Sequence, residues 1–206
     1  MKKLTAILVA LMMLLALSGC NAKNTSSATT TTATASEKKH QSAAEKARGY
    51  YYYEGIFLDT DEIRQAFLQA APDYPKNKLT PPEFHVTTAF KPETIHNDLY
   101  GTEVTVHIVG YASGTVFRED GAGESTNEGF LVEVSSDNEE MQALLDSYDK
   151  VWHITGSYSA EGYYTEYLDW DKTTPMDITV TGTFGGADSN EDFYMTPDAD
   201  IPDEAK

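Results

Sequence analysis

Hydrophobic and polar positions follow the same order twice between Tyr50 and Gly186. A Glu-Gly pair opens each copy, at residues 54–55 and 128–129, and an apolar run typical of a strand follows it. Apolar side chains at helical spacing come next: Ile63, Ala66, Phe67 and Ala70 in the first copy, and Met141, Leu144 and Leu145 in the second. The pattern therefore predicts a strand and then a helix at the start of each copy.

The ends of both predicted helices carry recognisable signals. Asp59 or Thr60 is placed to cap the first helix, and Pro72 to end it. In the second copy, Ser136 and Glu139 have the spacing of a capping box, in which each side chain bonds to the other residue's backbone.

Two further strands are expected in each copy. Residues 84–90 and 152–158 both read aromatic-His-aliphatic-Thr, and residues 103–109 and 177–184 alternate Thr with aliphatic side chains. Strands that alternate with single helices indicate an α+β fold with two pseudo-symmetric lobes facing each other across a cleft. Because side chains alternate along a strand, His85 and Thr87 share one side, as do His153 and Thr155, and we expect the two pairs to converge on the cleft.

The N-terminal residues have the three parts of an export signal. A basic start, Met1 to Lys3, precedes an apolar run over residues 4–17, which is shorter than the ~20 residues that a membrane-spanning helix needs. The run ends in Leu-Ser-Gly-Cys, which resembles the lipobox of bacterial lipoproteins. The resemblance implies that residues 1–19 are a signal peptide and that Cys20 carries acyl chains, which would anchor the protein to the cell membrane on its extracytoplasmic side. The alternative is an ordinary secretory signal with an incidental cysteine.

The remainder of the chain divides by composition. Residues 20–48 are rich in Ser, Thr and Ala and predict a disordered tether, because they contain almost nothing to bury. Residues 49–187 are long enough for one domain with its own core, and residues 188–206 form an acidic C-terminal tail. Cys20 is the only cysteine, so the domain has neither a disulfide nor a thiol nucleophile.

The charge balance argues against long nucleic acid as a partner. The full chain has a formal net charge of −18, and loss of Lys2 and Lys3 with the signal leaves 13 basic against 33 acidic residues, or −20. Nucleic acid is bound mainly through Lys and Arg contacts to phosphates, which such a surface disfavours. Most of the acidic residues are explained by the solubility of an exported protein. We expect a monomer.

The two motifs, His85-Val86-Thr87 and His153-Ile154-Thr155, resemble those of the 2H phosphoesterases, a family that includes 2′-5′ RNA ligase-like and cyclic phosphodiesterase proteins. The resemblance covers about residues 50–186. It implies a bilobal α+β domain in which two antiparallel sheets flank a central cleft that holds both motifs. It also implies hydrolysis of a small cyclic phosphate, such as a 2′,3′-cyclic nucleotide, or of a 2′-5′ phosphodiester, without a metal or other cofactor.

The residue types suit this chemistry. Imidazole titrates near neutral pH, so one histidine can act as the base and the other as the acid, in either order. The hydroxyls of Thr87 and Thr155 are placed to bind phosphate oxygens. Further candidates for substrate contact are Tyr53, Lys91, Trp152 and Tyr158, although aromatic residues also pack on sheet surfaces and lysines are commonly solvated.

Two other functions remain open on the sequence. The first is a 2H-like lipoprotein that has lost catalysis and acts as a ligand-binding or surface-interaction module. The second is an envelope protein of unrelated fold in which both histidines are structural, which the internal repeat argues against.

Overall fold

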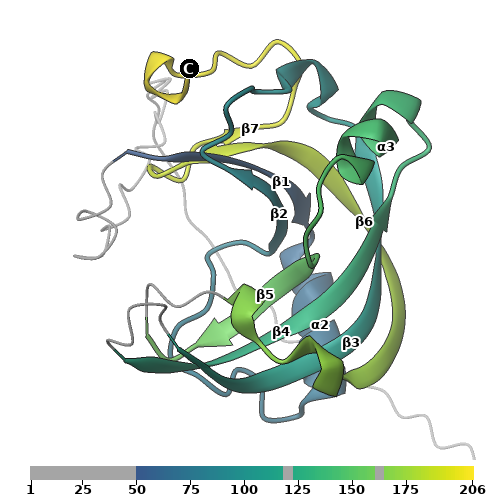
Figure 1. Cartoon of the computed structure of the whole chain (residues 1–206), viewed down its shortest axis with the longest axis vertical. Coiled ribbons are helices and arrows are strands. Elements are labelled where there is room, and N and C mark those ends of the chain that lie inside the picture. The colour runs from purple at the N-terminus through teal and green to yellow at the C-terminus, as the bar shows by residue number, and fades with distance from the viewer. Residues whose placement is uncertain (1–49, 118–122, 161–164) are drawn as a thin grey trace, which may run out of the picture. The chain divides into compact units, whose positions relative to one another are not determined.

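The computed structural model describes residues 50–117, 123–160 and 165–206 (Figure 1). The predicted signal peptide, Cys20 and the tether lie outside these ranges. The described part is a mixed α/β fold dominated by one antiparallel sheet with two helices. The strands are β1 (Tyr52–Leu58), β2 (His85–Phe90), β3 (Glu103–Phe117), β4 (Glu124–Ser135), β5 (His153–Tyr158), β6 (Thr174–Asp188) and β7 (Phe193–Tyr194). No helix in these ranges is long and apolar enough to cross a membrane.

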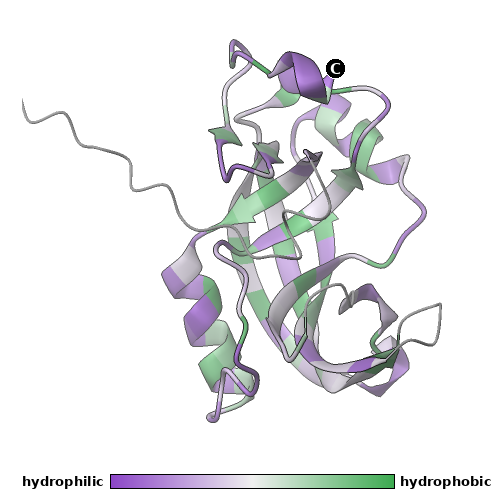
Figure 2. Ribbon diagram, turned by 90° about the vertical axis from the view of Figure 1, so that its left-hand side faces the viewer, coloured by the Kyte–Doolittle hydropathy of each residue, from purple (hydrophilic) through white to green (hydrophobic). Residues whose placement is uncertain are grey.

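The first helix, α2 (Thr60–Ala70), follows the sequence prediction. The Asp59 carboxylate caps it by accepting the N–H groups of Asp61 and Glu62 at 3.0 and 2.9 Å. Ile63, Ala66 and Phe67 are buried, which is the face that the apolar spacing predicted. Figure 2 shows hydrophobic and hydrophilic residues alternating along this helix, which lies beside the sheet.

The second helix, α3 (Glu139–Asp146), also forms, but the predicted capping box is wrong. The Asn138 side chain caps the helix by accepting the N–H groups of Glu140 and Met141, at 3.0 Å each. Ser136 instead donates its hydroxyl to the carbonyl of Glu103 on β3 at 3.0 Å. Asn is as good a cap as Ser, and it stands closer to the apolar face that begins at Met141. Short 3₁₀ turns cover Asn97–Leu99, Thr165–Tyr167, Trp170–Lys172 and Asp203–Ala205.

The strand order shows the internal repeat in three dimensions. Neighbouring strands run β1-β2-β5-β4-β3-β6-β7, and β1 also pairs with β6, so six antiparallel strands form a closed ring. Exchanging β1 with β4, β2 with β5 and β3 with β6 leaves the set of pairings among these six strands unchanged. The strand pairings therefore have a pseudo-twofold pattern, and along the chain each helix lies between the first two strands of its copy.

Two separate sheets were expected, and the structure has one. The β2–β5 and β3–β6 pairings join the strands of the two copies through hydrogen bonds. β3 and β6 are 15 residues each, far longer than the 103–109 and 177–184 segments predicted for them, so they reach across both copies. Closing the ring also removes free strand edges, which otherwise tend to pair with other chains.

The main hydrophobic core supports the sheet, and a second, smaller cluster consists of Ala112, Val116 and Leu168. Ile56, Val86, Phe130 and Ile154 come from four neighbouring strands and are all fully buried, and Phe67 of α2 stacks on Phe130 with ring centroids 3.9 Å apart. The residues assigned to an acidic tail contact the same core, because Ile201 is buried within it and β7 pairs with β6. The opposite face of β2 and β5, which carries the two motifs, is half-buried.

Candidate active site

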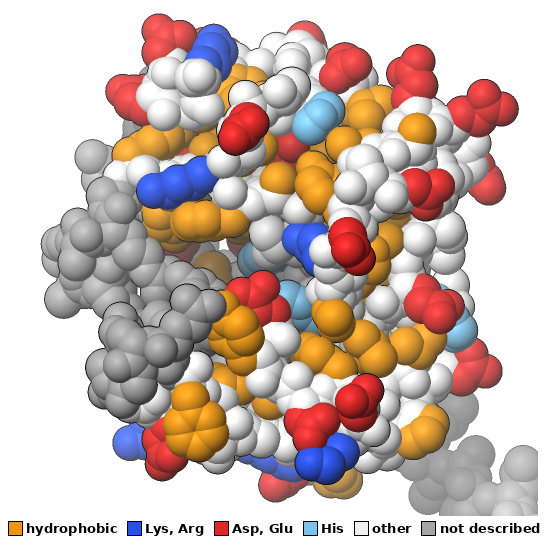
Figure 3. Space-filling model, viewed as in Figure 1, with side chains coloured by type: hydrophobic (Ala, Val, Ile, Leu, Met, Phe, Trp, Pro, Cys, Tyr) orange, Lys and Arg blue, Asp and Glu red, His pale blue; other side chains and the backbone are white. Residues whose placement is uncertain are grey.

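The two His-x-Thr motifs lie on adjacent strands. β2 and β5 pair antiparallel with Val86 opposite Ile154. This register places His85 across from Thr155 and Thr87 across from His153, so four half-buried side chains project from one face of the pair. Figure 3 shows histidine side chains in a hollow of the surface, with hydrophobic side chains above and below it.

Both imidazoles are held by the same backbone contact. Nδ1 of His85 lies 3.2 Å from the carbonyl oxygen of Glu83, and Nδ1 of His153 lies 3.1 Å from that of Val151. A carbonyl oxygen only accepts hydrogen bonds, so each Nδ1 is the protonated nitrogen and donates. In the neutral ring, Nε2 is then the basic nitrogen. The repeat thus presents two imidazoles whose reactive nitrogens are equivalent.

The environment shifts both histidines towards the neutral form. The pKa of His85 is lowered from 6.5 to about 4, mainly by burial; the Glu83 carbonyl opposes this shift and the charge of His153 adds to it. Burial also lowers the pKa of His153, which the Val151 carbonyl and Glu166 raise and Lys150 lowers. The effect of His153 on the pKa of His85 places the two rings within electrostatic reach.

Lys150 brings a positive charge close enough to His153 to lower its pKa. Its Nζ donates to the carbonyl oxygen of Thr88 at 2.8 Å and lies 5.0 Å from the centroid of the Trp152 ring. Partial burial lowers the pKa of Lys150, and the Glu166 carboxylate raises it. In a strongly acidic protein, this ammonium provides a local attraction for a phosphate group.

The Glu-Gly pairs of the repeat shape the strands beside the motifs. The β1–β2 register shifts between Glu54 and Gly55, and the β4–β5 register shifts at the equivalent point between Glu128 and Gly129. A Cβ on Gly55 would lie 3.0 Å from the carbonyl oxygen of Val86, and a Cβ on Gly129 would lie 2.6 Å from that of Ile154. Val86 and Ile154 are the central residues of the two motifs. Glycine therefore lets each neighbouring strand approach its motif closely at a bulge.

The glutamates of the same pairs are fully buried and hydrogen-bonded, a role the sequence analysis did not assign to them. Glu54 accepts the backbone N–H of His96 at 2.7 Å and the Tyr100 hydroxyl at 2.9 Å. Glu128 accepts the backbone N–H of Lys76 at 3.0 Å and the Tyr111 hydroxyl at 2.8 Å. Each carboxylate ties a loop to the sheet. In the sequence, the repetition of Glu before Gly was the available signal for this role, but it could not identify the hydrogen-bond partners of the two carboxylates.

The structure brings one of the four predicted substrate-contact residues to a histidine. The Tyr53 ring lies 5.0 Å from that of His85. Trp152 instead packs against the hydrophobic core, and Lys91 lies over the exposed ring of Phe90 at 5.8 Å. Tyr158 pairs through its backbone with Leu79, next to the α2–β2 loop.

Two aromatic residues near the histidines were not predicted. Phe57 lies 5.7 Å from His85 and Trp170 lies 5.8 Å from His153, between ring centroids. Phe57 has the period-two spacing from Tyr53 that places both on one face of β1. Only the β1–β2 pairing, with Phe57 opposite His85, shows that this face borders the motif.

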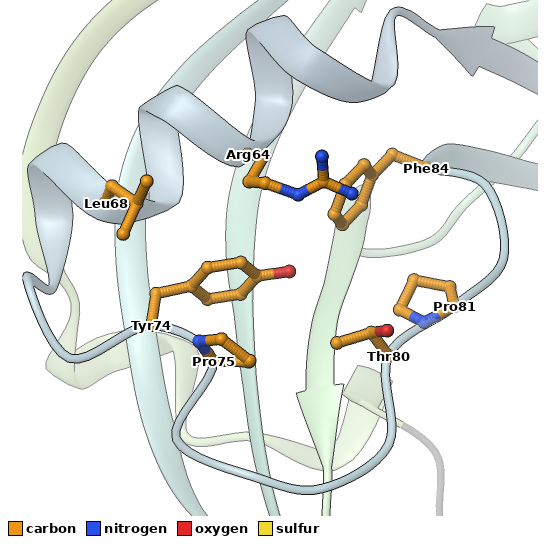
Figure 4. A pocket seen from close by; sticks show the side chains of 7 residues that line it. All are labelled: Arg64, Leu68, Tyr74, Pro75, Thr80, Pro81 and Phe84. Carbon is orange, nitrogen blue, oxygen red and sulfur yellow. The ribbon is translucent and has the colours of Figure 1, made fainter.

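A second hollow lies between α2 and the loop that leads to β2 (Figure 4). Arg64, Leu68, Tyr74, Thr80 and Phe84 line it, and none of the four motif residues takes part. Tyr74 stacks on Phe67 at 4.7 Å, so this hollow borders the core side of the sheet. Within the described ranges, no group of three or more His, Cys, Asp or Glu side chains has an arrangement that could hold a metal ion.

Comparisons with known proteins identify no family. A scan against protein-family models finds no match, and searches of curated proteins and of solved structures find none either.

Proposed function

We propose that this protein is a phosphoesterase of the 2H type, which hydrolyses a small cyclic phosphate resembling a 2′,3′-cyclic nucleotide, or a 2′-5′ phosphodiester. One observation carries the proposal: two imidazoles with the same Nδ1–carbonyl bond lie on one face of adjacent antiparallel strands, each across from the other motif's threonine. The pseudo-twofold pairing of the six strands supports a 2H-like bilobal arrangement, with β2 and β5 at its centre.

The geometry suits in-line opening of a cyclic phosphate. His85, whose pKa lies at about 4, is neutral near pH 6 and takes a proton from the attacking water at Nε2. The water oxygen bonds to phosphorus, and the bond from phosphorus to one ribose oxygen breaks. His153 gives its Nε2 proton to that oxygen. Exchange of protons with solvent then restores both rings.

The surrounding polar groups hold the phosphate between the two rings. The Thr87 and Thr155 hydroxyls face the same side as the histidines and can donate to the non-bridging oxygens. Lys150 adds a positive charge close to His153. The protonated imidazole supplies the remaining charge, so this mechanism assigns no role to a metal ion.

The test is turnover by the full-length chain, purified in detergent and assayed with EDTA. The substrates are 2′,3′-cyclic nucleotides, short 2′-5′ oligonucleotides and ADP-ribose cyclic phosphate. Loss of one acid or base typically lowers the rate ~10²- to 10⁴-fold, so we expect His85→Ala and His153→Ala each to show a drop of this size. His107→Ala is the matched control, because His107 is exposed on β3 and bonds Asp177 at 2.9 Å.

Turnover that survives in either motif variant contradicts the acid–base assignment. If the folded wild-type protein turns over none of these substrates, the proposed phosphoesterase activity is contradicted. A ligand-binding module built on the same fold is then favoured.

A further inference from the structure

The two histidines are equivalent, but the side chains next to them differ between the two copies. In the pseudo-twofold, Glu54-Gly55 of β1 corresponds to Glu128-Gly129 of β4, so Tyr53 corresponds to Asn127 and Phe57 to Leu131. Beside His85 the first copy therefore has two aromatic rings, at 5.0 and 5.7 Å. At the equivalent positions of the second copy, Asn127 is fully buried and donates to Thr165 Oγ1 at 3.1 Å, and Leu131 is aliphatic.

The aromatic wall, which consists of Tyr53, Phe57, Phe90 and Phe193, extends from beside His85 to the surface. Phe57 meets Phe193 of β7 edge-on, with ring centroids 5.3 Å apart. Phe193 is 37% exposed, which is high for a large apolar side chain. Tyr53 pairs directly with Phe90 across β1 and β2, and Phe90 is 55% exposed. Exposed apolar side chains that are clustered, rather than scattered singly, mark binding surfaces.

The chemistry of this wall selects a flat, uncharged ring. Aromatic faces stack on nucleobases with little dependence on which base is present, because every base has a π-face. The strongly acidic protein offers little to a free anion, whereas a base attached to the phosphate through a ribose adds an uncharged contact beside the reacting group. A base-free cyclic phosphate has nothing to place on these rings.

We propose that Tyr53, Phe57 and Phe193 form a subsite for the nucleobase of the substrate, which makes the substrate a nucleoside 2′,3′-cyclic phosphate. The assignment rests on the proposed phosphoesterase function. It fixes the orientation of the substrate, with the base on the β1 side of His85 and the scissile phosphate between the two histidines.

The experiment compares kcat/KM of the full-length chain for a nucleoside 2′,3′-cyclic phosphate and for 1-O-methylribose 2′,3′-cyclic phosphate, which lacks the base. From the typical strength of base stacking, we expect the nucleotide to be preferred roughly ten- to hundredfold. Phe57→Leu introduces the side chain found at the equivalent position, Leu131. This variant and Phe193→Leu should each reduce the preference severalfold, because kcat/KM falls more for the nucleotide than for the base-free substrate.

Two control variants define the outcomes. Phe117→Leu alters a 63% exposed ring at the end of β3 and should leave kcat/KM unchanged for both substrates. A preference that disappears in Trp170→Leu, but persists in Phe57→Leu, would place the base on the opposite wall and overturn the assignment. An equal fall for both substrates in Phe57→Leu would also overturn it, because it would show that Phe57 only supports His85.

The result separates this subsite from the phosphoesterase proposal. If the wild type turns over both substrates equally, the proposed nucleobase subsite is wrong, but the proposed phosphoesterase activity is supported. If it turns over neither substrate, the proposed phosphoesterase activity is wrong. Binding of a nucleoside 2′-monophosphate and of ribose 2-phosphate, measured by calorimetry, then tests the subsite. Binding of the nucleotide alone, weakened by Phe57→Leu, supports it, and equal or absent binding overturns it.

Discussion

The chemistry of the proposed site depends on which nitrogen of each histidine faces the substrate. The carbonyls two residues upstream, those of Glu83 and Val151, hold the Nδ1 protons. Because this contact is local, each motif carries its own means of orienting its imidazole, and duplication of the segment duplicates the orientation. The differences between the two sites come from the neighbours, which are aromatic beside His85 and include Lys150 and Trp170 beside His153.

The two histidines should give the proposed enzyme a bell-shaped dependence on pH. The base must be neutral and the acid protonated, so kcat/KM rises as pH increases through the pKa of the base and falls as pH increases through that of the acid. With the pKa of His85 at about 4 and that of His153 below 6.5, the rate should be bell-shaped with its maximum on the acidic side of pH 6.5. Initial rates of the free enzyme from pH 3.5 to 9 test this. A maximum above pH 8 would contradict the role of these two groups.

At the scale of elements, the repeated Glu-Gly pair connects the fold to the site. Its glutamate fixes a loop through a buried carboxylate, and its glycine lets the strand approach the motif at a bulge. Gly156, which follows the second motif, shows the same tight packing, because a Cβ there would lie 2.6 Å from the ring of Phe67 on α2. The positions of the histidines therefore depend on small residues in the neighbouring strand and in β5 itself.

Gly129→Ala tests this dependence. The new Cβ would meet the carbonyl oxygen of Ile154 at 2.6 Å, and backbone cannot rotate away as a flexible side chain can. We expect a loss of ~1–3 kcal/mol in the free energy of unfolding, as is usual for overpacking, together with a fall in kcat from displacement of His153. Gly114→Ala is the matched control, because its Cβ would lie 3.6 Å from Leu168, an ordinary contact. Equal stability of the two variants in urea unfolding would contradict the argument.

In the molecule as a whole, ring closure explains how a single sheet holds the two motifs at equivalent positions. β3 and β6 pair with each other and with β4 and β1, and they connect the two copies on the side away from the motifs. β2 and β5 connect them at the motifs. Strand pairing thus sets the separation of the histidines from both directions, which suits a site whose acid and base must lie on opposite sides of one phosphorus atom.

Attachment to the membrane is a prediction for the whole chain. If Cys20 carries acyl chains, the full-length protein expressed in a bacterial host should incorporate an alkynyl palmitate and fractionate with membranes. Cys20→Ala should abolish both, because Cys20 is the only cysteine. A labelled Cys20→Ala chain, or an unlabelled wild type, would contradict lipidation and leave an ordinary secretory signal.

The sequence alone was sufficient to predict the two helices, the approximate positions of the six longer strands, and their duplication. Helix α2 with its Asp59 cap, both motif strands and the pairing of His with Thr on one face depend on local periodicity, which neighbouring residues encode. The Ser136 cap failed because Asn138, two residues on, competes for the same role with equal chemistry.

The tertiary structure decided which elements meet. Pairings such as Glu54 with Gly186, which closes the ring, and Val86 with Ile154, which joins the motifs, link residues far apart in the chain. No local pattern specifies them, because a strand's alternation defines its two faces and not its neighbour. The single sheet, the partners of the buried glutamates and the aromatic wall beside His85 all follow from these pairings. The two histidine motifs and their repetition are therefore encoded locally, and the long-range strand pairing places them side by side with different neighbours.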